Sequence, residues 1–263
     1  MNKVAIVTGG SSGIGLWTAR ALRDRGCAVW VFSRRPFTEQ GLHHVCVDVA
    51  DEPQVIDAVQ TVLRYEKRVD ILVNCAGFGI SGAVEFTELA AAKKQMDVNF
   101  FGTVNATKAV LPVMRAQGGG RIVSVSSVAA PVAIPFQTYY SATKAAINAY
   151  TCALANEVRP YGIGVTAVQP GDIATGFTAA REKSAVGDEA YGGRISKSVA
   201  KMEHDEQNGM KPEVAGAYVA KLALKKKVKP LYTIGFGYKC VCLLCKLLPC
   251  GLLNRLVGLL YAG

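Results

Sequence analysis

The sequence is poor in several features that would assign a protein to a class directly. Its three histidines are scattered, and we interpret them as surface residues. It also lacks an uninterrupted apolar run close to the ~20 residues that a membrane-spanning helix requires. The most apolar segment, residues 232–263, is interrupted by Lys246, Asn254 and Arg255. We therefore expect no transmembrane helix.

Neither a leader segment nor a disulfide framework is expected. The first apolar run, Val4–Thr8, begins almost at the initiator methionine, which leaves no room for a signal or transit peptide and predicts a cytoplasmic protein. Cysteines in that compartment are normally reduced thiols. Four of the eight form the pattern C-x-C-x2-C-x4-C: Cys240, Cys242, Cys245 and Cys250. Four thiols can hold zinc, but these lie among leucines without a second cysteine cluster, so we expect buried apolar side chains and no metal site.

Acidic side chains are almost missing from the last fifth of the chain. Residues 211–263 hold nine of the 30 lysines and arginines but only one of the 20 acidic residues, Glu213, so most of the net charge of +10 belongs there. Because these cations lie beside leucines and not among aromatic side chains that stack on bases, we expect no nucleic-acid binding. This segment is either a flap over a substrate pocket or a partner subunit, or an amphipathic segment in peripheral contact with a membrane.

Apolar strand-like runs alternate with helical patterns along the chain. Strands are expected at residues 4–8, 27–33, 45–49, 69–73, 121–125, 162–169 and 231–235, and a long helix at about 89–117. Such alternation predicts an α/β fold, in which helices cover both faces of a parallel sheet. Residues 176–210 are polar and contain several glycines, and we interpret them as a lid and not as a second domain.

A glycine-rich turn lies between the first strand and the first helix. Gly9 permits a tight turn, Gly13 lets the backbone approach a pyrophosphate, and Gly15 allows close packing of the helix. The helix N-terminus would then face the phosphates of a dinucleotide. The candidate ligands in this turn are Gly9, Ser11, Ser12, Gly13, Ile14 and Gly15.

The end of the second strand indicates which nicotinamide cofactor is preferred. An acidic residue at this point would accept hydrogen bonds from the ribose of NAD(H). This chain has Ser33, Arg34 and Arg35 instead. Because the planar guanidinium group matches phosphate oxygens, the sequence favours NADP(H).

Tyr140 and Lys144 are four residues apart in a helical segment, which places them on one helix face. A phenol has a pKa near ~10, and a fixed ammonium group nearby lowers that value. The pair is therefore suited to moving a proton near neutral pH. Ser127 follows the expected strand at 121–125, and its hydroxyl could hydrogen-bond a substrate oxygen.

These features together resemble the short-chain dehydrogenase/reductase family, in its classical branch. The matching motifs occur in the family's order over roughly residues 1–235: Thr8-Gly9-x3-Gly13-x-Gly15, Asn74-x-Ala76-Gly77, Asn99, Ser127, Tyr140-x3-Lys144 and Pro170-Gly171-x-Ile173-x-Thr175. The resemblance implies a single Rossmann-like, doubly wound domain spanning residues 1–263 with about seven parallel strands. In it, residues 1–235 form the core and 236–263 a C-terminal extension.

The resemblance also implies a catalytic tetrad. Asn99 would anchor a water, Ser127 would bind the substrate oxygen, Tyr140 would donate the proton, and Lys144 would lower the tyrosine pKa and hold the nicotinamide ribose. Tyr139 lies next to Tyr140, but only Tyr140 has the family spacing to the lysine. Further cofactor-binding positions implied by the resemblance are Asp48, Val49, Asn74, Ala76, Gly77, Pro170, Gly171, Ile173 and Thr175.

The expected activity is the NADP(H)-dependent interconversion of a ketone and a secondary alcohol. A looser likeness of the C-terminal extension to the steroid- and retinoid-type branch favours a small apolar substrate, such as a steroid or bile acid. One alternative is a 3-oxoacyl-thioester reductase that binds an acyl carrier. Another, from a different class, is a nucleotide-sensing scaffold without catalysis, to which the intact tetrad is the main objection. The family further implies a homodimer or homotetramer.

Overall fold

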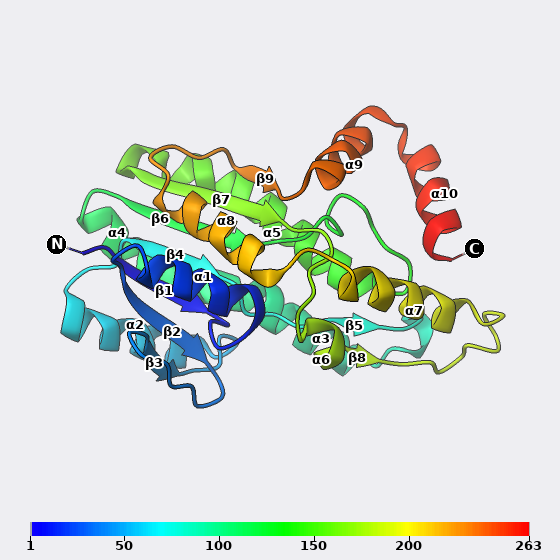
Figure 1. Cartoon of the computed structure of the whole chain (residues 1–263), viewed down its shortest axis with the longest axis horizontal. Helices are drawn as coiled ribbons and strands as arrows, with labels where there is room; N and C mark the ends of the chain where they lie inside the picture. The colour runs from blue at the N-terminus through cyan, green and yellow to red at the C-terminus, as the bar shows by residue number, and fades with distance from the viewer. Residues whose placement is uncertain (1, 263) are drawn as a thin grey trace.

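A parallel seven-stranded sheet runs through the protein in the computed structural model, which describes residues 2–262 (Figure 1). The strands lie in the order β3-β2-β1-β4-β6-β7-β9. Their bounds are β1 (Val4–Thr8), β2 (Ala28–Ser33), β3 (His43–Cys46), β4 (Ile71–Asn74), β6 (Gly120–Val125), β7 (Ile163–Gln169) and β9 (Leu231–Thr233). The chain reverses its direction of travel across the sheet between β1 and β4, where ligands bind in open α/β sheets. The predicted fold class is confirmed.

Both faces of the sheet are buried, as the strand sequences predict. Val4 and Ile6 of β1 belong to one apolar core, whereas Ala5 and Val7 belong to the other. This division follows from the two-residue period of a strand, which sends successive side chains to opposite faces. Helices on both sides complete the two cores.

The helices that cover the first face are α2 (Glu52–Glu66), α4 (Gly102–Ala116) and α5 (Thr138–Glu157), and those that cover the second are α1 (Gly13–Arg23) and α8 (Pro212–Leu224). Beyond one end of the sheet lie α3 (Leu89–Met96), the short strands β5 (Ile80–Ser81) and β8 (Glu182–Lys183), α6 (Phe177–Ala180) and α7 (Arg194–Gln207) (Figure 1). The last two helices, α9 (Phe236–Leu247) and α10 (Cys250–Tyr261), project away from the sheet.

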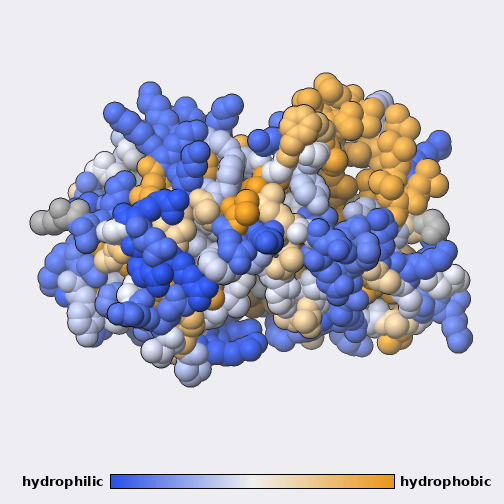
Figure 2. Space-filling view, in the orientation of Figure 1, coloured by the Kyte–Doolittle hydropathy of each residue, from blue (hydrophilic) through white to orange (hydrophobic). Residues whose placement is uncertain are grey.

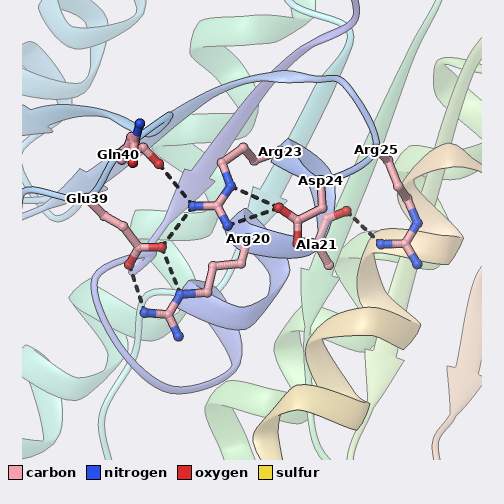
Figure 3. Close-up of polar contacts among 7 residues, drawn as sticks. All are labelled: Arg20, Ala21, Arg23, Asp24, Arg25, Glu39 and Gln40. Atoms are coloured by element: carbon pink, nitrogen blue, oxygen red, sulfur yellow. Dashed lines mark hydrogen bonds and ion pairs between the residues drawn. The ribbon is translucent and has the colours of Figure 1, made fainter.

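The loop between β2 and β3 is fastened to α1 by charged side chains (Figure 3). Glu39 accepts hydrogen bonds from Arg20, at 2.9 and 2.8 Å, and from Arg23, at 3.0 Å. The hydrogen bond from Arg20 is the main reason why the pKa of Glu39 lies below its usual range. These contacts hold the loop that begins with Arg34 and Arg35 against the helix of the glycine turn.

Two expected elements differ from the structure by more than small shifts of their ends. The third strand, expected at residues 45–49, spans His43–Cys46. The chain leaves the sheet early because the Asp48 carboxylate accepts a hydrogen bond from Ala50 N (3.0 Å), which begins a turn towards α2. The long helix expected at 89–117 is interrupted by a π-helical segment, Asp97–Phe101, that contains Asn99. Such one-turn π segments are frequent at functional sites.

The expectation of buried cysteines in the C-terminal extension is wrong. Cys240 and Cys250 are exposed, and Cys242 and Cys245 are half-buried, because α9 buries none of its residues fully against the rest of the described chain. Within residues 2–262, no group of three or more His, Cys, Asp or Glu side chains is arranged to hold a metal ion. No helix in that range combines the length and the apolar character needed to cross a membrane.

Candidate active site

The carboxyl ends of the central strands surround a cavity of about 810 Å³. Nearly all of the predicted site residues line it. They are Gly9, Ser11, Ser12, Gly13, Ile14, Gly15, Ser33, Arg34, Arg35, Asp48, Val49, Ala76, Gly77, Ser127, Tyr140, Lys144, Pro170, Gly171, Ile173 and Thr175. Residues that are up to 166 positions apart in the sequence are thus brought together on one surface.

The glycine turn requires its glycines. Gly9 has φ +63°, and a Cβ atom there would lie 2.8 Å from the backbone of Ala76. A Cβ on Gly15 would lie 2.3 Å from the carbonyl oxygen of Gly9. The side chain of Ser12, the residue before α1, makes no capping hydrogen bond, so the first amide groups of this helix remain available to phosphate oxygens. The turn therefore fits a pyrophosphate.

The part of the cavity after β2 has the chemistry expected for a 2′-phosphate. Ser33 donates a hydrogen bond to the carbonyl oxygen of Arg35 (3.1 Å), which shapes the turn after β2. The Arg34 guanidinium lies 4.0 Å from the Asp48 carboxylate, and its side chain is 59% exposed. A contact this long and exposed leaves the planar group able to bind phosphate oxygens. The residues present fit a phosphorylated dinucleotide.

Tyr140, Lys144 and Ser127 meet where α5 packs against the end of β6. The Lys144 ammonium donates a hydrogen bond to Val125 O (2.8 Å) and lies 5.5 Å from the centre of the Tyr140 ring. Ser126 Oγ donates a hydrogen bond to Lys144 O (3.1 Å), which fastens the helix to the end of the strand. A phenol, a hydroxyl and an ammonium group therefore face the same cavity.

The pKa of Tyr140 shifts in the direction opposite to the one expected. Burial raises the pKa of Tyr140 to about 12, although hydrogen bonding with the Ser127 hydroxyl lowers it in part. The net lowering expected from Lys144 is not found, because burial is the largest influence on this phenol and shifts its pKa upwards. Burial also lowers the pKa of Lys144 to about 8. Tyr140 is thus a well-protonated acid, and the charge of Lys144 is sensitive to pH.

Two predicted site residues do not line the cavity. Asn99 is fully buried, where its side chain accepts a hydrogen bond from Phe78 N (3.0 Å) and donates to Phe78 O (2.9 Å) and Thr143 Oγ1 (3.2 Å). Asn74 is also buried and donates to Thr107 and Ser124. The Asn99 amide thus holds the loop after β4, which forms part of the cavity wall, and the Asn74 amide joins the end of β4 to α4 and β6.

Sequence motifs gave no indication of the rest of the wall. Phe177 of α6 packs against Tyr140, with 5.7 Å between ring centres, and Met202 and Glu206 of α7 lie further along. Tyr261, at the end of α10, lines the cavity as well. These residues come from the predicted lid and the C-terminal extension, and only the three-dimensional fold brings them to Tyr140.

Acidic residues also lie on this wall, and Glu206 is one of them. It accepts a hydrogen bond from Thr178 Oγ1 (2.6 Å) and pairs with the buried Arg181. Asp172, after β7, also borders the cavity. The wall around Tyr140 is therefore apolar at Phe177 and Met202 and also carries the carboxylates of Asp172 and Glu206, of which Glu206 is paired with Arg181.

A dinucleotide-binding sheet that carries a Ser–Tyr–Lys group at its carboxyl edge defines a nicotinamide-dependent oxidoreductase. A family profile described as short chain dehydrogenase matches residues 3–185. The chain belongs to this family of oxidoreductases, as the motifs predicted.

Known relatives agree in sequence and in fold. A 3-ketodihydrosphingosine reductase of Bacteroides thetaiotaomicron is 40% identical, and the alignment covers 89% of this chain and 91% of the relative. A short-chain dehydrogenase from Streptomyces avermitilis has a solved structure with a TM-score of 0.81 and 28% identity, covering 92% of this chain and 91% of that one. ElxO with NADP bound has a TM-score of 0.76 and 26% identity, covering 91% of this chain and 100% of that one.

Tyr140→Phe tests the position of the acid. Removing the phenolic oxygen is expected to lower turnover by about 10²- to 10⁴-fold, the usual contribution of a general acid. Binding of NADPH, followed by its fluorescence, should persist because the ring remains. Tyr139→Phe is the matched control, since Tyr139 does not line the cavity, and it should keep full activity. Full activity in Tyr140→Phe would refute the assignment.

Proposed function

We propose that this protein is an NADPH-dependent reductase of a ketone on a long apolar chain, of the type named for the Bacteroides relative. The observation that carries the proposal is the shared cavity of Ser127, Tyr140 and Lys144, whose adjoining wall is apolar at Phe177 and Met202. Identity of 40% over nine-tenths of both chains supports the same substrate class. The fit of Arg34 to a phosphate supports NADPH.

Bound NADPH would supply the hydride, and the chain's own groups would manage the oxygen and the proton. Ser127 would hydrogen-bond the carbonyl oxygen as negative charge develops on it. Tyr140 would donate its proton to that oxygen, and the charge of Lys144 would stabilise the resulting phenolate. Asn99 would anchor a water that connects Lys144 to solvent.

The acidic part of the cavity favours a substrate that carries a cation. 3-Ketodihydrosphingosine has an amino group on the carbon next to its ketone. Burial raises the pKa of the Asp172 carboxyl, the hydrogen bond from Tyr238 lowers it in part, and the nearby carboxylates Asp205 and Glu206 raise it. An ammonium group bound beside Asp172 would relieve this repulsion. A steroid or bile acid, the substrates first expected, would not.

We place the protein in the cytoplasm, with its C-terminal extension in peripheral contact with a membrane. A homodimer or homotetramer would form through the helices that hold Asn99 and Tyr140. Phe101, in the same segment as Asn99, is 48% exposed and would be covered in such a contact.

Arg34→Ala tests the cofactor preference. A charge-assisted hydrogen bond to phosphate contributes about 1.5–3 kcal/mol, so the Kd of NADPH should rise about tenfold or more. The Kd of NADH, which has no 2′-phosphate, should stay the same. Arg64→Ala, a change at another exposed arginine, is the control. Equal effects on both cofactors would contradict the assignment.

The substrate class is tested by NADPH oxidation with five ketones. They are 3-ketodihydrosphingosine, the same ketone without its amino group, a keto-steroid, a keto bile acid and an acetoacetyl thioester. The amino ketone should give the highest kcat/KM, and Asp172→Asn should raise its KM while leaving the KM of the analogue without the amine unchanged. A higher kcat/KM for the steroid, bile acid or thioester would instead favour one of the alternatives, and no oxidation with any of them would favour a silent scaffold.

A further inference from the structure

The two C-terminal helices form an arm that is fixed at both ends but uncovered in between. The arm leaves the sheet after β9, turns at Pro249 between α9 and α10, and returns to α7 (Figure 1). At its far end Ala262 is buried beside Phe136 and Ile195, and its carbonyl oxygen accepts a hydrogen bond from Arg194. The arm therefore has a defined position.

The outer face of the arm is the largest concentration of exposed apolar side chains visible in Figure 2. Nine of the 18 large hydrophobic residues found exposed in residues 2–262 belong to it: Phe236, Val241, Leu243, Leu244, Leu247, Leu252, Leu256, Leu259 and Leu260. Among them, Phe236 is 84% exposed and Leu259 75%. Exposed apolar patches of this kind mark interaction surfaces.

The apolar residues lie on one side of each helix. Phe236, Leu243 and Leu247 of α9 follow the i, i+7, i+11 spacing of a single helix face. Leu252, Leu256 and Leu259 of α10 repeat this at i, i+4, i+7. No residue of α9 is buried, and in α10 only Val257 is. Both helices are thus amphipathic, with their apolar sides turned away from the protein.

The charges around the arm indicate what covers it. The sequence has no acidic residue after Glu213. Lys239 and Lys246 lie seven residues apart beside the apolar face of α9, and Arg255 lies on α10. A second copy of the chain on this face would bring like charges together, which is unfavourable. Anionic lipid headgroups would neutralise them while the leucines enter the acyl region.

We propose that α9 and α10 form an interfacial arm that binds an anionic lipid bilayer and opens the catalytic cavity towards it. Each helix has 12 residues, so it is about 18 Å long and suited to lying in the plane of the interface. The binding of the arm to lipid is inferred from the exposed apolar and cationic side chains of α9 and α10 alone. Delivery of the substrate from the bilayer rests on the proposed function.

The inner side of the arm belongs to the catalytic site. Tyr238 of α9 donates a hydrogen bond to Asp172 Oδ2 (2.6 Å) and accepts one from Asp172 N (3.1 Å). Its ring packs on Gly171, where a Cβ atom would lie 2.1 Å from the ring. Tyr261 of α10 lines the cavity directly. One surface of the arm would therefore contact the bilayer while the other borders the cavity, which shortens the path of a long-chain ketone from membrane to Tyr140.

Sedimentation of the full chain with lipid vesicles tests the binding. Vesicles of phosphatidylcholine mixed with phosphatidylserine should bind the protein, and pure phosphatidylcholine vesicles should bind it much less. The affinity should fall in high salt, which screens the charges. Leu243→Glu with Leu247→Glu, and separately Lys239→Glu with Lys246→Glu, should each weaken binding at least about tenfold. Leu89→Glu changes an exposed leucine of α3 and should have no effect.

Activity measurements separate the two proposals. With a short, water-soluble ketone the arm variants should keep the wild-type kcat/KM, whereas with a long-chain ketone carried in vesicles they should lose most of it. Failure of the wild-type protein to sediment with anionic vesicles would overturn the arm's role. A dimer in solution that Leu243→Glu with Leu247→Glu dissociates would overturn it too, in favour of a second copy. Vesicle binding without any ketone reduction would overturn the proposed function and its substrate delivery, but leave the lipid contact standing.

Discussion

The burial of one ammonium group, that of Lys144, is the constraint on which the site depends. Moving an ammonium group out of water costs free energy unless polar groups replace its hydration. Here the Val125 carbonyl oxygen, at 2.8 Å, and the face of the Tyr140 ring take that place. The replacement is incomplete, because the pKa of Lys144 still falls to about 8. The strand end and the helix face must both be fixed for this contact to exist.

The surrounding polar contacts provide that rigidity. Ser126 fastens the Lys144 backbone to the end of β6, and Asn99 joins the loop at Phe78 to Thr143 on α5. The same dry environment raises the pKa of Tyr140 to about 12. A phenol of this kind keeps its proton until a developing negative charge draws it away.

Local motifs predicted the sheet, the glycine turn and the residues at the strand ends, because each depends on short-range backbone chemistry. A Cβ atom at position 15 would collide with the Gly9 carbonyl oxygen, so only glycine fits there, and the glycine itself is visible in the sequence. No sequence motif marks Glu206 or Tyr261 as a cavity residue, since their place in the cavity depends on how distant helices pack. The tyrosine pKa was predicted in the wrong direction because the spacing of two residues does not reveal which atoms the lysine contacts, nor how dry the site is.

The pH dependence of kcat/KM for ketone reduction tests the central claim most directly, because it reports the ionisations of the free enzyme. Below a pH of about 8 the ammonium group of Lys144 is charged and the Tyr140 phenol is protonated, so the rate should be high. It should decline as the pH rises through about 8 and Lys144 loses its proton. A profile that stays flat until the ordinary lysine pKa of about 10.4 would show that this group is not buried as described.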